Sequence, residues 1–372
     1  MLIRRQIPFF NYQALFAAQE HELLAIMRDV LSRGAYILQR DLKEFESALA
    51  AYLGVKHAFG MADGTNAIVL ALRAAGIGPG DEVIVPSHTF IASVFPIKSL
   101  GATPVLVECG DDHLLDPAAA EAAVTIRTKA ILPVHLNGRT CDMAAIQAVA
   151  TRHGLAIIED AAQGLGSKFE NRFAGTFGLA GTFSFYPAKS LGCFGDGGAL
   201  VTNDDKVAEQ VELWRDHGRN KDGEVVDWGT NCRLDNLQAA VLNFKLKSFD
   251  AAVARRREIA RAYDNRLKNI KDLILPPAPD ADPNHFDVYQ NYEMQSLRRD
   301  ELRAYLEQYG VRTLLQWGGR AVHQFKKLGL DATLPKTTLM TSRFIMLPMN
   351  TSLADDDVTY ICDVIEQFHS KA

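Results

Sequence analysis

The sequence predicts an α/β fold, with a mostly parallel sheet flanked by helices and a smaller C-terminal α+β domain. Between about residues 57 and 215, short apolar runs alternate with Ala- and Leu-rich helical stretches, a pattern typical of a parallel sheet. The length of 372 residues exceeds what one compact core usually holds, so a second domain is expected. A proline-rich stretch at 276–279 indicates a linker-like segment.

The expected strands are near-continuous apolar runs, as strands buried on both faces of a sheet require. They cover 82–85, 104–107, 130–134, 155–158, 181–186 and 198–202. Helices are expected between the strands, and a glycine that stops the helix follows each one. They cover 65–75 before Gly76, 90–100 before Gly101 and 143–153 before Gly154.

A long helical pattern, from Leu234 to about Asn269, ends the α/β region. We therefore divide the chain into a large domain, 1–250, which includes an N-terminal arm, and a small α+β domain, 251–372. Because no period of 20 to 50 residues repeats, the sequence excludes solenoids and propellers.

Composition argues against several classes of function. The 48% hydrophobic and 23% charged residues are ordinary for a folded protein, and the 40 basic residues are scattered, so we expect no nucleic-acid surface. No window approaches the ~20 apolar residues that span a bilayer, and the first residues lack a signal-peptide pattern, so we expect a cytoplasmic protein without a membrane role. Five widely spaced cysteines without a C-x-x-C pair indicate reduced thiols, and we predict no metal site.

The first motif is the small-residue turn Asp63-Gly64-Thr65, which follows a predicted strand and opens a helix. Free backbone N–H groups at the positive end of a helix suit a phosphate. An ordinary N-cap explains the same residues, and for this motif alone it is the more common case. Asp63 is unusual, because an acid repels a phosphate unless its side chain points away.

The second motif, 157–163, places Asp160 at the carboxyl edge of a buried strand, where open α/β sheets bind ligands. A buried acid needs a partner, and in a pyridoxal phosphate (PLP) site that partner is the protonated pyridine nitrogen. Gln163, one helical turn later, can reach the ring oxygen. The alternative is structural: Asp160 caps a helix that begins at Ala161, and Glu159 is a solvated strand end.

The third motif, 182–190, is a strand that leads into a constrained turn with Lys189, and a glycine-rich segment follows at 195–198. A lysine that forms a Schiff base must lose its proton, and burial or a neighbouring cation lowers its pKa. Ser184 can donate its hydroxyl to the cofactor phosphate. A lone lysine is usually a solvated surface charge, but the small residues around Lys189 let a cofactor approach the backbone.

Together with Pro86-Ser87-His88-Thr89-Phe90 and the segment 233–240, these motifs resemble the DegT/StrS-type nucleotide-sugar aminotransferases. That family is a branch of the fold-type I PLP-dependent transferases, in the aspartate aminotransferase superfamily. The resemblance runs from about Ile7 to the C-terminus. It implies transfer of an amino group from an amino acid, expected to be L-glutamate, to a keto sugar. That sugar is expected to be nucleotide-linked, in amino-sugar or surface-polysaccharide biosynthesis.

The resemblance also implies roles for individual residues. Lys189 would carry PLP covalently and Asp160 would pair with the pyridine nitrogen. The further cofactor contacts are Gly64, Thr65 and Ser184 at the phosphate, Phe90 on the ring, Gln163 at the ring oxygen, and Asn231 from the other subunit. Each site of the expected homodimer would then contain residues of both subunits. The alternatives are that Phe90 packs in the core and that Asn231 is a turn residue.

Two segments, 134–139 and 315–323, depart from the pattern of the family where it usually meets its substrate. Within them we select Arg139, Arg320 and His323 as substrate contacts, with ordinary surface charge as the alternative. A non-catalytic PLP-binding regulator or sensor is a rival interpretation. A PLP-dependent sugar dehydratase is disfavoured, because those relatives carry histidine at the position of Lys189.

Overall fold

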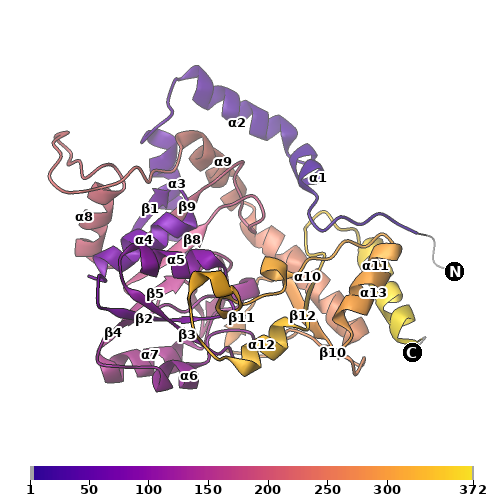
Figure 1. Ribbon diagram of the computed structural model, residues 1–372. Coiled ribbons are helices and arrows are strands. Elements are labelled where there is room, and N and C mark those ends of the chain that lie inside the picture. Colours follow the sequence, from indigo (N-terminus) through magenta and orange to yellow (C-terminus); the bar gives the residue numbers. More distant parts are fainter. Residues whose placement is uncertain (1–3, 371–372) are drawn as a thin grey trace.

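The computed structural model describes residues 4–370 and contains a seven-stranded sheet, whose strands are labelled in Figure 1. The strand order is β1-β9-β8-β5-β4-β2-β3, and every neighbouring pair is parallel except the two pairs that involve β9. The strands are β1 (His57–Met61), β2 (Glu82–Pro86), β3 (Thr103–Val107), β4 (Thr128–Ile131), β5 (Ala156–Asp160), β8 (Ala180–Ser184) and β9 (Gly198–Thr202). The prediction of a mostly parallel sheet is confirmed.

One strand differs clearly from its predicted range. The sequence predicts a strand at 130–134, whereas β4 ends at Ile131. Pro133 has no N–H to donate, so the regular ladder cannot continue through it. The chain nevertheless stays beside β5, because Asp160 N–H donates to the Pro133 carbonyl (3.0 Å) and Val134 forms an isolated bridge with Asp160.

The three predicted helices between the strands begin and end within one residue of their predicted ranges. They are α4 (Gly64–Ala74), α5 (Ile91–Ser99) and α7 (Met143–His153). Gly76, Gly101 and Gly154 lie just beyond these helices with φ of +76°, +80° and +65°, the left-handed conformation that stops a helix. Further helices beside this sheet are α3 (Arg40–Leu53), α6 (Pro117–Ala122) and α8 (Asp205–Trp214).

The predicted continuous helix over 234–269 is wrong, because the structure divides it into α9 (Asn236–Leu246) and α10 (Phe249–Leu267). Helix α9 packs against α2 (Glu20–Ser32) and α3, whereas α10 packs against α13 (Asp355–Ser370). The break at Ser248 changes the direction of the chain, so that α9 can pack against α2 and α3 while α10 packs against α13. Helix α10 contributes to two hydrophobic clusters, with Phe249 in one and Tyr263 in the other, so it belongs to both parts of the chain. The domain boundary at 250 stays a prediction.

The C-terminal part contains a three-stranded antiparallel sheet in the order β10-β12-β13. Its strands are β10 (Leu273–Ile274), β12 (Tyr292–Ser296) and β13 (Phe344–Leu347), and its helices include α11 (Arg299–Gln308) and α12 (Pro335–Thr341). A small third sheet joins β6 (Lys168–Phe169) and β7 (Arg172–Phe173) to β11 (His285–Phe286). This pairing ties the segment before β12 to the chain between β5 and β8 of the large sheet.

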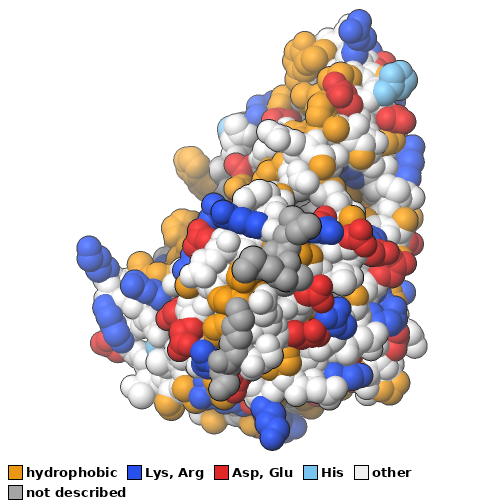
Figure 2. Space-filling view, turned by 90° about the vertical axis from the view of Figure 1, so that its right-hand side faces the viewer, with side chains coloured by type: hydrophobic (Ala, Val, Ile, Leu, Met, Phe, Trp, Pro, Cys, Tyr) orange, Lys and Arg blue, Asp and Glu red, His pale blue; other side chains and the backbone are white. Residues whose placement is uncertain are grey.

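The N-terminal arm consists of α1 (Tyr12–Ala17) and α2, and α2 stands away from the large sheet in Figure 1. Leu24 and Leu31 of α2 are about half exposed. On the face shown in Figure 2, acidic and basic side chains are interspersed. Among residues 4–370, no helix is long and apolar enough to cross a bilayer.

We predict that Gly154→Ala lowers the free energy of unfolding by about 1 kcal/mol, because a side chain disfavours the left-handed conformation at this helix end. No atom lies within 4 Å of a Cβ at this position, so the loss would come from the backbone alone. Chemical denaturation measures the change. Gly78→Ala is the matched control, since Gly78 also has open space but no left-handed φ, and it should leave stability unchanged or slightly raised. Equal effects of the two substitutions would contradict the explanation.

Candidate active site

The predicted cofactor residues gather at the carboxyl ends of parallel strands. Asp160 ends β5, Ser184 ends β8, and Phe90 precedes α5 just after β2. Gly64, the first residue of α4, packs against the end of β8, where a Cβ on Gly64 would lie 3.1 Å from the Ser184 Cβ. Segments more than 100 residues apart in the sequence therefore meet at one edge of the sheet, as ligand sites of open α/β sheets do.

Asp160 is a buried carboxylate, only 4% exposed. Its Oδ2 accepts a hydrogen bond from the Ser93 hydroxyl (2.6 Å) and its Oδ1 accepts one from the Ala162 N–H (3.0 Å). No Lys, Arg or His of residues 4–370 forms an ion pair with it. No helix begins at Ala161, so the alternative role as a helix cap is wrong. A buried carboxylate with these partners still has lone pairs for a further N–H donor.

Lys189 lies in a turn five residues beyond the end of β8 and is half-buried. Burial lowers the pKa of its amine to about 8, against the opposing effect of the Asp160 charge. The amine has no hydrogen-bond partner in the part of the chain that the structure describes. An amine that burial makes easier to deprotonate, and that has no hydrogen-bond partner, is what a Schiff-base lysine needs.

Lys189 also lines a cavity of about 370 Å³, together with Phe10 and Tyr12 of the N-terminal arm. Asp160 and Gly64 do not line this cavity. A cofactor held by both Lys189 and Asp160 would therefore need space outside this cavity as well.

The predicted phosphate end combines Gly64, Thr65 and Ser184. The Asp63 side chain caps α4, because it accepts hydrogen bonds from the Asn66 N–H (2.8 Å) and the Asn66 side-chain amide (2.7 Å). In the described part of the chain, no acceptor takes the N–H groups of Gly64 and Thr65. The helix end therefore keeps two free donors for a phosphate, and Asp63 is occupied by its cap.

Phe90 is 52% exposed, so the alternative that it packs in the core is wrong. Its ring lies nearly parallel to that of Trp317, with centroids 6.3 Å apart and planes at 27°. Trp317 has a positive φ of 49°, which is uncommon for a bulky residue. An exposed aromatic face at the edge of the sheet suits a planar ring.

The side chain of Gln163 is held at one end. Its Oε1 accepts from the backbone N–H of Asn137 (2.8 Å) and from the side chain of Asn291 (3.1 Å). The other end, Nε2, has only a long contact of 3.4 Å to Gln316. Because a backbone N–H can only donate, this arrangement fixes the amide so that its N–H₂ remains a donor.

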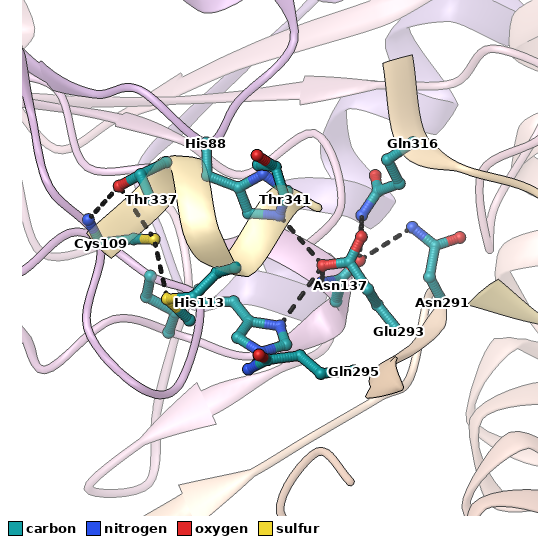
Figure 3. Close-up of polar contacts among 12 residues, drawn as sticks. His88, Cys109, His113, Asn137, Asn291, Glu293, Gln295, Gln316, Thr337 and Thr341 are labelled. Atoms are coloured by element: carbon teal, nitrogen blue, oxygen red, sulfur yellow. Dashed lines mark hydrogen bonds and ion pairs between the residues drawn. The ribbon is translucent and has the colours of Figure 1, made fainter. Parts of the chain in front are cut away.

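A buried polar cluster around Glu293 was missed by the sequence analysis (Figure 3). Glu293 lies on β12, and its carboxylate accepts from His88 (3.0 Å), from Asn137 (3.0 Å) and from Gln316 (2.7 Å). His113 lies 3.4 Å away. Burial raises the pKa of Glu293, but the two histidines outweigh it and hold the net pKa well below its usual range.

This Glu293 cluster helps to hold Gln163, one of the predicted cofactor contacts, because Asn137 and Gln316 in turn contact Gln163. The only sequence signal is the alternation of the polar residues Glu293 and Gln295 with Tyr292 and Met294. Such an alternation is equally typical of a strand with one solvated face.

Glu159 was expected as a possible solvated strand end, and this is wrong because the side chain is fully buried. Its carboxylate accepts hydrogen bonds from His135 (2.8 Å) and from the N–H groups of Gly175 (2.8 Å), Phe177 (2.6 Å) and Gly178 (2.6 Å). Glu159 therefore fixes the loop before β8 and has a structural role beside Asp160.

Asn231 lies in the exposed loop between α8 and α9. It forms an isolated bridge with Asp216, and no contact in the described residues joins it to Lys189 or Asp160. One chain therefore does not bring Asn231 into the site.

The three predicted substrate residues differ in their surroundings. Arg139 forms ion pairs with Asp287 (2.6 Å) and Asp282 (3.0 Å). His323 is buried, with its ring nitrogens 2.7 Å from the Ser87 hydroxyl and 2.8 Å from that of Thr338.

Burial lowers the pKa of His323, so its neutral form is favoured. Arg320 is exposed, and no ion pair holds it among residues 4–370. Of the three side chains, that of Arg320 is the one whose charge is free for a ligand.

Comparison with known proteins identifies the family. The sequence model of the DegT/DnrJ/EryC1/StrS aminotransferase family matches residues 17–366. The dTDP-3-amino-3,4,6-trideoxy-alpha-D-glucose transaminase of Streptomyces venezuelae is 41% identical over 369 residues, which cover 98% of this chain and 96% of that protein. A Geobacillus stearothermophilus protein named pleiotropic regulatory protein is 38% identical over 368 residues, covering 98% of each.

Solved structures share the fold. DesV of S. venezuelae, in complex with a ketimine intermediate, has a TM-score of 0.94 and 39% identity, covering 99% of both chains. NtdA of Bacillus subtilis, with bound cofactor PMP, has a TM-score of 0.90 and 28% identity, covering 100% of this chain and 86% of the other. PMP is the aminated form of PLP, and the buried acid and unpaired lysine fit that group. The chain belongs to the DegT/DnrJ/EryC1/StrS aminotransferase family of PLP-dependent, fold-type I enzymes.

Proposed function

We propose that this aminotransferase moves an amino group from L-glutamate to a keto sugar linked to a nucleotide, in amino-sugar or surface-polysaccharide biosynthesis. The observation that carries the proposal is the unpaired, half-buried amine of Lys189 beside the buried carboxylate of Asp160. The sugar substrate is supported by relatives whose names specify it, such as the S. venezuelae transaminase.

Each residue has a defined task in this proposal. PLP, when bound, supplies a ring that accepts the electron pair released as a proton leaves the substrate. Asp160 accepts the pyridine N–H, and the free amine of Lys189 takes and returns the proton at the substrate carbon. Gly64, Thr65 and Ser184 hold the phosphate, Phe90 covers one ring face, and Gln163 donates to the ring oxygen.

Two rivals differ from this proposal at specific points. A sugar dehydratase of this fold is disfavoured because position 189 is lysine. A regulator that binds PLP without turnover is the second candidate, because a relative 38% identical over nearly the whole chain is named a regulatory protein. Turnover with an amino donor separates the two functions.

A homodimer with shared sites is part of the proposal. Asn231 lies in the same exposed loop as Trp228, whose side chain is 88% exposed, and Val225, which is 69% exposed. A loop with such apolar side chains suits burial against a second subunit. We also propose a cytoplasmic location, since all five cysteines are free and buried, as thiols in a reducing compartment are.

The PLP-loaded protein is expected to show a visible absorption band that L-glutamate abolishes and that a keto sugar nucleotide restores, because the amino group passes through the cofactor in two half-reactions. Absorption spectroscopy with each substrate added separately measures this. Lys189→Ala should lack the wild-type band. A band that no amino donor changes would favour the regulator.

The rate of PLP uptake by the cofactor-free protein is expected to rise with pH and to level off above about 8. The unprotonated amine is the nucleophile, and burial lowers the pKa of Lys189 to about 8. Stopped-flow absorbance between pH 6 and 10 measures the profile. A rate that keeps rising to pH 10 would mean that the amine has the pKa of an exposed lysine.

Shared sites predict complementation between two inactive variants, Lys189→Ala and Asn231→Ala. A dimer of one chain of each contains one site with both native residues, so an equal mixture should recover up to about a quarter of the wild-type activity. Coexpression with two different tags isolates the mixed dimer. No recovery in that dimer would show that Asn231 acts within its own chain, whereas an Asn231→Ala variant that is active by itself would show that Asn231 has no role.

A further inference from the structure

The side chain of Gln290 holds both neighbours of Lys189 in the chain. Its Nε2 donates to the carbonyl of Ala188 (2.8 Å), and its Oε1 accepts from the N–H (2.5 Å) and the hydroxyl (2.7 Å) of Ser190. Gln290 is 6% exposed and lies 100 residues after Ser190 in the sequence. One side-chain amide therefore holds the backbone on both sides of Lys189, the residue proposed to bind the cofactor.

The backbone of Gln290 is itself held in place. Arg256 is buried without an acidic partner in the described chain, and its Nη1 donates to the carbonyls of Tyr289 (3.1 Å), Gln290 (3.2 Å) and Met349 (2.7 Å). Tyr289 has a positive φ of 49°, which is strained for a bulky residue.

Gly138 packs directly against this segment, since a Cβ there would lie 2.5 Å from the Gln290 nitrogen. Any larger residue at position 138 would displace the backbone of Gln290. The structure thus maintains an unfavourable backbone conformation at Tyr289 and a close backbone contact, and together they direct Gln290 toward the Lys189 turn.

We propose that Gln290 is a positioning residue for Lys189, which fixes the turn from Ala188 to Ser190 and so aims the amine at the cofactor. The amine has no hydrogen bond of its own in residues 4–370, so its direction depends on the backbone of this turn. Misplacement of a reacting group by about 1 Å costs on the order of 100-fold in rate. The inference deepens the proposed function, because it depends on Lys189 as the residue that binds PLP.

The test compares Gln290→Met with Gln238→Met. Gln238 is a matched control, because its amide makes the same kind of contacts, donating to the Phe194 carbonyl (2.9 Å) and accepting from the Phe194 N–H (2.9 Å). Phe194 lies five residues beyond Lys189. The Gln238→Met substitution therefore loosens the loop after Lys189 but leaves the contacts of Gln290 with Ala188 and Ser190 in place.

Both variants are made cofactor-free with hydroxylamine, and PLP uptake is followed by absorbance at pH 9, above the pKa of Lys189 near 8. We expect Gln290→Met to slow uptake by about 10- to 100-fold and to weaken the visible circular dichroism of the bound cofactor. Gln238→Met should stay within about 2-fold of wild type, and thermal melting of each cofactor-free protein reports the general loss of stability.

PLP uptake by Gln290→Met at the wild-type rate would overturn the positioning role, and so would an equal loss of rate in both variants. Should Gln290→Met fail to fold, Gln290→Asn decides, because it keeps the polar group but lacks the reach to hold both Ala188 and Ser190. Wild-type uptake by Gln290→Asn would likewise contradict the proposal. A wild-type protein that takes up no PLP would overturn the proposed function itself, and with it this inference.

Discussion

The buried charge of Asp160 is the constraint on which the rest of the site depends. A carboxylate removed from water costs several kcal/mol unless donors surround it. The turn after β5 supplies the Ala162 N–H, and α5 supplies the Ser93 hydroxyl, which itself lies 2.6 Å from the Thr89 hydroxyl. These neutral donors stabilise the charge without neutralising it. No ion pair in residues 4–370 neutralises this carboxylate, so it suits the protonated pyridine ring that we propose it binds.

Three residues around the proposed site have a strained backbone. Asn137, Tyr289 and Trp317 all have φ near +50°, a conformation that costs on the order of 1 kcal/mol or more for each residue. Each one directs a group of the proposed site: Asn137 holds Gln163, Tyr289 precedes Gln290, and Trp317 stacks near Phe90. The Glu293 cluster offsets part of this strain, because it binds Asn137 and Gln316 directly (Figure 3).

Sequence reasoning succeeded where a short segment carries its own physical signal. The apolar strands, the helix-stopping glycines and the turn before α4 are all local features. The roles of Asp160 and Lys189 also rest on local motifs, and they stay predictions. It failed where the outcome depends on distant partners. His88 and Glu293 are 205 residues apart, and no local pattern reveals that a histidine will stabilise that acid. The break between α9 and α10 likewise follows from two packing surfaces that the helical periodicity cannot show.

Arg139 illustrates the same limit for substrate recognition. Its position after β4 suggests a cation for an anionic sugar, but Asp282 and Asp287 neutralise it from 143 and 148 residues away. Removing one partner of such a buried pair costs about 3–5 kcal/mol, so a substrate gains little by competing for Arg139. His323 is similarly occupied by Ser87 and Thr338. Of the two arginines among the predicted substrate residues, Arg320 alone has no ion pair within residues 4–370, so an anionic substrate would depend on Arg320 and, in the proposed homodimer, on residues of the second subunit.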